Sequence, residues 1–190
     1  MTDITPIAAQ VDITQRASSP DAPSVLAFGS DLKASFAISR GGSVVPSQYI
    51  GDLENYSTYE NYTKELERFK ALYAFKPSLL VCDKHPLYIS SQLAREYAKI
   101  NDIPLIKVQH HHAHTASVMA EQGWESALGV SLDGTGYGDD GALWGGEFLC
   151  CRRGKMTRMG QLEYVRLCGG DKASTDASLV AQCYLHAIPE

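Results

Sequence analysis

The chain has 190 residues, of which 44% are hydrophobic and 21% are charged, a composition typical of a soluble globular domain. Its 17 basic and 22 acidic residues give a net charge of −5, so it lacks the positive field that attracts nucleic acid. No apolar run approaches the roughly 18 residues of a membrane span, and the N-terminus does not resemble a signal peptide. We therefore expect a cytoplasmic protein that binds neither nucleic acid nor a membrane.

The N-terminal third predicts a leader followed by three strands. Residues 1–23 mix small polar residues and prolines without periodicity, which indicates a flexible leader or linker. Three short apolar segments follow at 24–28, 34–39 and 43–48, separated by short turns that contain glycine. Strands joined by short turns pair in antiparallel fashion, so we expect an antiparallel meander.

Helices and strands then alternate. Apolar residues at helical spacing predict helices at 56–75 and 90–100, and short apolar runs predict buried strands at 79–82 and 104–109. A strand, helix, strand order implies parallel pairing with right-handed crossovers. Further strands are expected at 127–132, 142–151 and 156–165, with a last helix at 174–186. The order indicates an α/β fold with flanking helices and a mixed sheet whose first three strands are antiparallel, that of a ribonuclease-H-like lobe of the actin-like ATPase superfamily.

Four of the six histidines fall between residues 110 and 114. They follow the predicted strand 104–109, so they open a helix at the carboxyl end of a strand, where open α/β sheets place their ligands. On a helix His110 and His114 stand at i and i+4 with Cβ atoms about 5–6 Å apart, a separation that one metal ion can bridge. The alternative is a surface helix that happens to be rich in histidine; we favour metal binding.

Asp133 follows the predicted strand 127–132, so it reaches the same edge of the sheet and can supply a carboxylate as a third ligand. Two histidines and one carboxylate suit zinc or ferrous iron. A stretch rich in aspartate and glycine is also common in plain turns, and we assign Asp139 and Asp140 to such a turn.

Two glycine-containing loops are candidates for binding phosphate. The loop after Asp133 is rich in glycine, which lets backbone amides turn towards an anion. The loop between the first two strands occupies the place where an actin-like lobe wraps phosphate, although its sequence also fits an ordinary hairpin turn. The candidate residues are Gly29, Ser30, Lys33, Gly134, Gly136 and Gly138.

The segment that follows the strand 79–82 combines three ionisable side chains. It could place Asp83 or His85 at the edge of the site, and a loop that caps a helix is an equally good interpretation. Arg158 belongs to a basic cluster that we interpret as the solvated end of a strand.

Six motifs occur in a characteristic order: GSDLK, SQYIGDLEN, CDKHPLYISSQLA, VQHHHAHTA, LDGTGYGDDGALWGGEFL and LCGGDKA. The set closely resembles the HypF family, the carbamoyltransferases of nickel–iron hydrogenase maturation, from about Val25 to Ala173. More distantly, the chain is similar to the TsaD family, which has its own H-x-x-x-H motif.

The resemblance implies an activity, its cofactors and a partner. HypF proteins use carbamoyl phosphate and ATP to form carbamoyl adenylate, and then transfer the carbamoyl group to the C-terminal cysteine of HypE. His110, His114 and Asp133 would hold a divalent metal, zinc or iron, beside the carbamoyl adenylate. The expected partner is a HypE-like protein with a C-terminal cysteine.

The chain also departs from the family pattern. In the family further modules precede this region, and we expect a chain without them, in which residues 24–190 form a single HypF- or TsaD-like lobe without the second lobe. We therefore expect the chain to be an incomplete fragment that cannot transfer the carbamoyl group by itself. The alternative is a non-catalytic module of the same family that binds a metal or a nucleotide.

Overall fold

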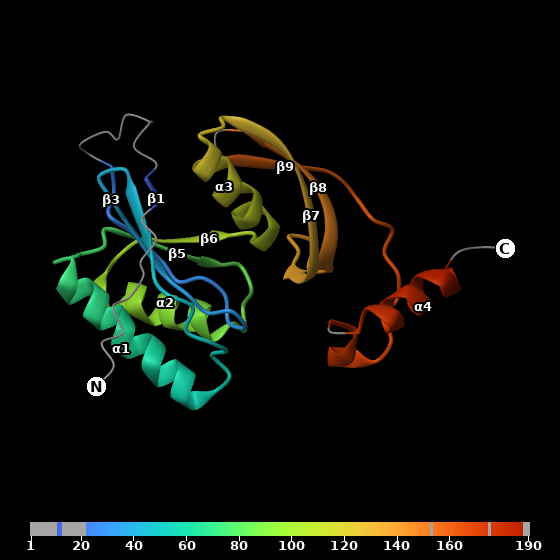
Figure 1. Cartoon of the computed structure of the whole chain (residues 1–190), viewed down its shortest axis with the longest axis horizontal. Helices are drawn as coiled ribbons and strands as arrows, with labels where there is room; N and C mark the ends of the chain where they lie inside the picture. Colours follow the sequence, from blue (N-terminus) through green and yellow to red (C-terminus); the bar gives the residue numbers. More distant parts are fainter. Residues whose placement is uncertain (1–10, 13–21, 153, 175, 188–190) are drawn as a thin grey trace.

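The structure is a computed structural model that describes residues 11–12, 22–152, 154–174 and 176–187. The described residues form a six-stranded sheet, a separate three-stranded sheet and four α-helices (Figure 1). The predicted leader, residues 1–23, lies outside the described residues except for 11–12 and 22–23.

The six-stranded sheet confirms the expected mixed topology. Its order is β1-β4-β3-β2-β5-β6. β2, β3 and β4 form the predicted antiparallel meander, β1 adds antiparallel to β4, and β5 and β6 extend the sheet in parallel from β2. The strands are β1 (Val11–Asp12), β2 (Val25–Ala27), β3 (Ala37–Arg40), β4 (Ser43–Pro46), β5 (Leu79–Asp83) and β6 (Leu105–Val108).

Two helices contribute to the main core of the six-stranded sheet. α1 (Tyr56–Leu72) buries Tyr62, Leu66 and Phe69, which recur at i, i+4 and i+7 and so share one face of a helix. Burial of each such side chain stabilises the fold by about 1.5–3 kcal/mol. The hydroxyl of Tyr62 donates a hydrogen bond of 2.8 Å to the carbonyl of Phe28, which satisfies its polar atom. α2 (Ile89–Asn101) packs beside β5 and β6.

We expected a single mixed sheet, whereas the last three strands form a second sheet. β7 (Ser126–Tyr137), β8 (Leu143–Arg152) and β9 (Lys155–Gln161) pair only with one another among the described residues. β7 is twelve residues long and pairs with β8 along most of its length, and it lies at the edge of this three-stranded sheet.

α3 (His110–Gln122) covers one face of the second sheet. Its Met119 packs into a small core with Leu149 and Cys151 of β8. After β9 the chain continues into a 3₁₀ helix (Gly170–Ser174) and α4 (Ala177–Ala187), which lies on the far side of β7–β9 from the six-stranded sheet (Figure 1). None of the described helices is long and apolar enough to cross a membrane.

The loop between β2 and β3 is anchored to the start of α2. The buried carboxylate of Asp31 accepts hydrogen bonds from the backbone N–H groups of Ile89 (2.7 Å) and Ser90 (2.9 Å). The hydroxyl of Ser90 donates to the carbonyl of Gly29 at 3.2 Å. Asp31 therefore caps a helix that begins 58 residues later in the chain.

We predict that Asp31→Ala lowers the free energy of unfolding by about 1–2 kcal/mol, because two N–H groups at the start of α2 lose their acceptor. Urea denaturation followed by circular dichroism measures the change. Glu96→Ala, at an exposed position of α2, is the control and should change stability by less than about 0.5 kcal/mol. Equal stability of the two variants would contradict the capping role.

Candidate metal centre

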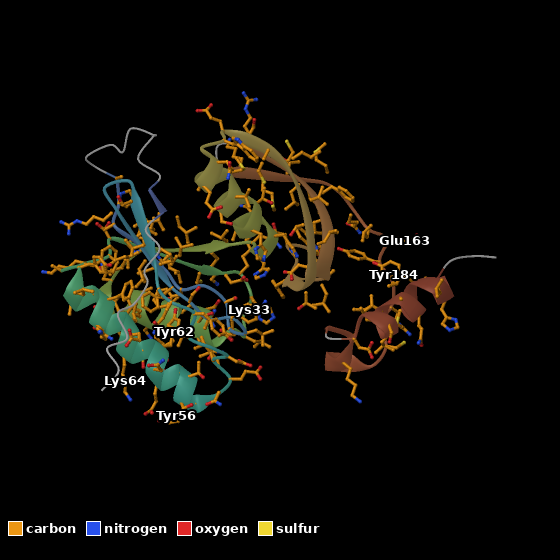
Figure 2. The ribbon with its side chains drawn as sticks, in the orientation of Figure 1. Lys33, Tyr56, Tyr62, Lys64, Glu163 and Tyr184 are labelled. Atoms are coloured by element: carbon orange, nitrogen blue, oxygen red, sulfur yellow. The ribbon has the colours of Figure 1, made fainter. Side chains whose placement is uncertain are left out.

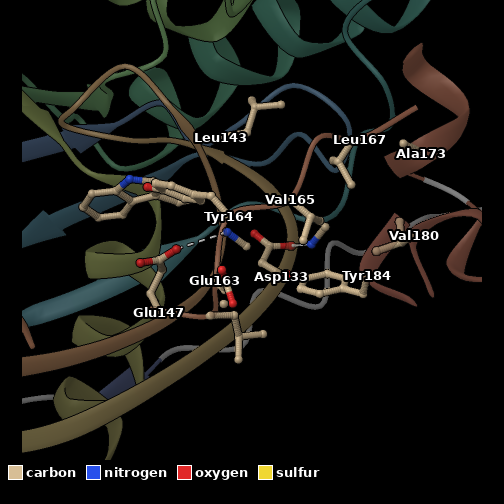
Figure 3. A pocket seen from close by; sticks show the side chains of 15 residues that line it. Asp133, Leu143, Glu147, Glu163, Tyr164, Val165, Leu167, Ala173, Val180 and Tyr184 are labelled. Atoms are coloured by element: carbon tan, nitrogen blue, oxygen red, sulfur yellow. Dashed lines mark hydrogen bonds between the residues drawn. The ribbon is translucent and has the colours of Figure 1, made fainter. Parts of the chain in front are cut away.

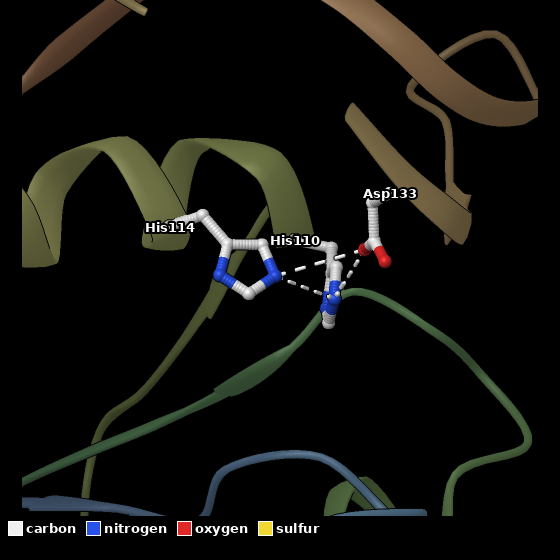
Figure 4. A group of neighbouring side chains, drawn as sticks. All are labelled: His110, His114 and Asp133. Atoms are coloured by element: carbon white, nitrogen blue, oxygen red, sulfur yellow. Dashed lines mark hydrogen bonds and ion pairs between the residues drawn. The ribbon is translucent and has the colours of Figure 1, made fainter. Parts of the chain in front are cut away.

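Three side chains predicted as metal ligands converge in the structure (Figure 4). Nε2 of His110 lies 3.1 Å from Nε2 of His114 and 3.2 Å from Oδ2 of Asp133. Nε2 of His114 lies 3.6 Å from the same carboxylate oxygen. One ligand atom from each residue lies within 4.8 Å of the others, so the group could hold a single ion.

Parallel pairing of β5 with β6 positions the histidines. Asp83, the last residue of β5, stands opposite Val108, the last residue of β6, and Gln109 then starts α3. The side chain of Gln109 accepts a hydrogen bond of 2.9 Å from the backbone N–H of His112, which is an N-terminal cap. The helix therefore begins at once, and His110 and His114 share the face one turn apart.

An irregularity in β7 positions Asp133. The register between β7 and β8 shifts between Leu132 and Gly136, as at a β-bulge that re-aims a side chain. Gly145 lies opposite, where a Cβ atom would come within 2.8 Å of the carbonyl oxygen of Asp133. Oδ1 of Asp133 accepts from the N–H of Gly134 at 2.7 Å, which leaves Oδ2 towards the histidines.

Asp83 orients His110. Its Oδ2 lies 2.7 Å from Nδ1 of His110, and the two side chains are 7% and 16% exposed respectively. The hydrogen bond with Asp83, assisted by the charge of Asp133, raises the pKa of His110 above its ordinary value. Because the carboxylate can only accept, Nδ1 carries the proton, and Nε2 of the neutral ring presents a lone pair to the other ligands.

That lone pair makes the geometry favourable for a cation. When His110 is neutral, its Nε2 and Oδ2 of Asp133 are both acceptors only 3.2 Å apart, an arrangement that repels unless a proton or a metal lies between them. Atoms bound at about 2.0–2.2 Å to one zinc-like ion lie about 3–3.6 Å apart. The separations of 3.1, 3.2 and 3.6 Å fall in this range, so the donor set fits a divalent metal.

The other histidines of the cluster lie outside the ligand group. His111 is completely buried and packs beside Gly136, where a Cβ atom would come within 2.4 Å of the ring. Burial, together with the charge of His110, lowers the pKa of His111. Burial, followed by the nearby charge of Lys84, also lowers the pKa of His112.

Three of the glycines predicted to bind phosphate, Gly29, Gly136 and Gly138, pack closely against neighbouring atoms. Gly138 lies where a Cβ atom would come within 2.2 Å of Nε1 of Trp144, and at Gly29, where φ is +64°, it would come within 2.1 Å of the carbonyl oxygen of Ser35. Lys33 is exposed and lies at the end of the six-stranded sheet that faces β7–β9 (Figure 2). Phosphate binding by these two loops stays a prediction.

Arg158 is a residue whose environment the sequence did not indicate. Its side chain is only 19% exposed, and its Nε donates to the buried carboxylate of Glu147 at 2.6 Å. It also lies 3.2 Å from Oδ2 of Asp140 and 3.9 Å from the ring of Trp144. For Arg158 the interpretation as a solvated strand end is therefore wrong, because its partners come from β8 and the β7–β8 loop, which only the tertiary fold brings together.

A pocket of about 210 Å³ lies beside this network (Figure 3). Asp133 and Gly134 line it on one side, and Leu167, Val180 and Tyr184 of the C-terminal segment line it on another. The pocket therefore shares Asp133 with the candidate metal centre.

The mixed sheet with its antiparallel meander, and a candidate site at the carboxyl ends of its parallel strands, have the fold of an actin-like ATPase lobe. YeaZ from Pseudomonas aeruginosa shares this fold, with a TM-score of 0.53 at 13% identity over 74% of this chain and 66% of that one. The family model described as the HypF Kae1-like domain matches residues 20–121, and the model of the second subdomain of the carbamoyltransferase Kae1-like domain matches residues 129–190. The chain belongs to the HypF family.

Individual relatives agree with this assignment. The carbamoyltransferase HypF2 of Cupriavidus necator is 41% identical over 87% of this chain and 21% of its own length, and the HypF of a Synechocystis species is 41% identical over 81% and 20%. The crystal structure of a full-length HypF in its phosphate- and nucleotide-bound form superposes with a TM-score of 0.76 at 37% identity, covering 88% of this chain and 21% of that one. The chain thus spans about a fifth of the length of these relatives.

The two family models divide the chain between α3 and β7. His110 and His114 fall in the first match and Asp133 in the second, so the candidate ligands come from both matched segments. The expectation that residues 24–190 form a single lobe stays a prediction. Two family models match this range, and its described strands form two separate sheets.

We predict that His110→Ala and His114→Ala each reduce the zinc retained by the purified protein, because each removes one of three ligands. Elemental analysis after dialysis measures the metal-to-protein ratio. His112→Ala is the matched control, since His112 is on the same helix but outside the ligand group. Equal metal content in all four proteins would rule out these ligands.

Metal affinity should depend on pH through His110. A metal binds only the deprotonated Nε2, and the raised pKa keeps His110 protonated to a higher pH than the usual 6.5 or so. As the pH is lowered from about 8.5, zinc affinity should therefore already start to fall before the pH reaches 6.5, and it should fall further at more acidic pH. Zinc titrations between about pH 5.5 and 8.5 test this, and an affinity that stays constant across pH 6.5 would contradict it.

Proposed function

We propose that the chain supplies the metal centre of a carbamoyltransferase that moves a carbamoyl group from carbamoyl adenylate to the C-terminal cysteine of a HypE-like protein. The observation that supports this most is the convergence of His110, His114 and Asp133, with Asp83 behind His110. The names of the HypF relatives support carbamoyl transfer as the reaction class.

The proposed step is a substitution at the carbamoyl carbon. The sulfur of the cysteine thiolate forms a bond to this carbon, and the bond from the carbon to the phosphate oxygen breaks. AMP leaves with the bonding electron pair, and the thiol proton passes to solvent. A bound divalent metal would supply positive charge beside the oxygen on which negative charge develops.

The residues of the chain would act by holding the three candidate ligands in a fixed geometry. Asp83 keeps the His110 ring in one tautomer and one orientation, which is the usual role of a carboxylate behind a histidine ligand. The bulge in β7 keeps Oδ2 of Asp133 on the histidine side. A preorganised donor set does not have to reorganise when the substrate arrives.

The nucleotide is proposed to approach along the two glycine-containing loops. The nucleotide-bound state of a HypF structure with 37% identity supports a nucleotide ligand. Lys33 would contribute positive charge from the first loop, and the amides after Asp133 would contribute from the second. The pocket that includes Asp133 and Gly134 offers space next to the metal centre.

A cytoplasmic location is part of the same proposal. All five cysteines are free, which is compatible with a reducing compartment. In such a compartment the acceptor cysteine of the partner would also remain a thiol.

A segment exchange tests the function, because the chain spans about a fifth of its relatives. Residues 22–187 would replace the matching segment of HypF2 of Cupriavidus necator, and the purified chimera would receive ATP, carbamoyl phosphate and a HypE-like protein. Mass spectrometry of the acceptor cysteine should detect one added carbamoyl group. In the chimera, His110→Ala should reduce the initial rate of carbamoyl transfer by about 100-fold or more. His112→Ala should leave this rate within about two-fold of that of the unsubstituted chimera.

The alternative is a module that binds a metal or a nucleotide without taking part in catalysis. A folded chimera that retains metal but leaves the acceptor cysteine unmodified would favour this alternative. A chimera that transfers the group equally well with His110→Ala would exclude the metal centre from the reaction.

A further inference from the structure

His111 contains a buried polar atom that the metal centre as described does not use. Its ring is completely buried, and its Nε2 has no hydrogen-bond partner among the described residues. A buried donor without a partner costs about 1–3 kcal/mol, so its retention next to the candidate site requires an explanation.

The hydrogen bonds of Gln109 determine which nitrogen of His111 carries the proton. Oε1 of Gln109 accepts from the backbone N–H of His112 at 2.9 Å, which fixes the orientation of the amide. Nε2 of Gln109 therefore lies towards Nδ1 of His111 at 3.1 Å and donates to the carbonyl of Tyr137 at 3.3 Å. An amide N–H can only donate, so Nδ1 of His111 accepts and the proton of the neutral ring is on Nε2.

The packing of the ring directs this N–H towards the metal centre. Gly136 approaches Cε1 so closely that any side chain there would clash, and Trp144 stacks on the ring with centroids 6.2 Å apart and planes at 29°. The ring is thus confined. Nε2 lies 3.8 Å from Oδ2 of Asp133, slightly beyond the length of a hydrogen bond.

We propose that His111 is a positioning residue that donates a hydrogen bond from Nε2 to Oδ2 of Asp133 when the site holds its metal. The inference rests on the proposed metal centre. Oδ2 has two lone pairs, so it can bind the ion with one and accept from His111 with the other. Closure from 3.8 Å requires a shift of less than about 1 Å, and it would satisfy the orphan donor.

The bond would select one binding mode of Asp133. Oδ1 already accepts from the N–H of Gly134, and His111 would add a second fixed contact on the other oxygen. The carboxylate would then be held at both oxygens, with one lone pair of Oδ2 left for the ion. Hydrogen-bonded partners of this kind behind a ligand typically contribute 10- to 100-fold in metal affinity.

Zinc affinity measured by competition with a chromophoric chelator tests the proposal. His111→Leu removes the donor and should weaken zinc binding by about 10- to 100-fold. His111→Gln keeps an N–H close to the position of Nε2 and should recover most of the loss. His112→Leu, the same substitution one residue later, should bind zinc like the wild type.

Nitrogen NMR of the wild type gives a second measurement that does not depend on whether the variants fold. The His111 ring should be protonated at Nε2 with and without zinc, and zinc should move the Nε2–H proton signal downfield as the hydrogen bond forms. Protonation at Nδ1, or a proton signal unchanged by zinc, would overturn the proposal.

The outcomes distinguish failure of the proposed metal centre from failure of the proposed role of His111. If the wild type does not bind zinc, the proposed metal centre itself fails. If the wild type binds zinc and folded His111→Leu binds it equally well, only the role of His111 is overturned. If His111→Leu weakens binding and His111→Gln does not restore it, the effect comes from packing of the ring and the hydrogen bond is rejected.

Discussion

The contact between Asp83 and His110 is the interaction on which the candidate site depends. It exists because β5 and β6 are parallel neighbours that end at the same level, so a carboxylate at the end of one strand meets a histidine at the start of the helix that follows the other. This contact fixes the proton on Nδ1 and aims Nε2 at His114 and Asp133. Without it the His110 ring could rotate, and the lone pair would not be held towards the other ligands.

The site also joins the two sheets, between which the described strands make no pairing. Asp133 comes from β7, whereas the histidines lie on the helix that follows β6. Three further contacts cross the same junction: Lys84 pairs with Asp139 at 2.6 Å, Gln109 donates to the carbonyl of Tyr137, and His111 packs against Gly136. An ion held by His110, His114 and Asp133 would add a strong link, so metal binding and the relative placement of the two sheets should be coupled.

Local sequence patterns predicted the features that depend on local geometry. The antiparallel meander follows from short turns, and the shared face of His110 and His114 follows from helical periodicity. The expectation that Asp133 follows the end of a strand at the same sheet edge is wrong, because Asp133 lies inside β7 of the second sheet, at the register shift between Leu132 and Gly136. The separate second sheet could not be predicted in this way, because the partner of β7 is chosen by long-range pairing. For the same reason the sequence left the role of Asp83 open, since its partner lies 27 residues away, and misassigned Arg158.

The glycines of the loop after Asp133 are a second case in which local sequence patterns did not predict the tertiary contacts. Their spacing indicated a loop that could turn amides towards an anion, but spacing alone cannot distinguish that use from close packing. In the structure Gly136 and Gly138 make room for the rings of His111 and Trp144. These glycines therefore help to place a buried imidazole beside the carboxylate of Asp133, whatever the amides of the same loop bind.

Adjacent histidines on α3 are thereby given different protonation properties by their surroundings. His110, bonded to Asp83, has a raised pKa and a site that attracts a cation; His111, buried beside glycine and tryptophan, has a lowered pKa and remains a neutral donor. A helix turns about 100° per residue, so two neighbours in sequence necessarily face different environments. The cluster of histidines is therefore better understood as two pairs: His110 and His114 as candidate ligands on one face, and His111 and His112 on other faces, outside the ligand group.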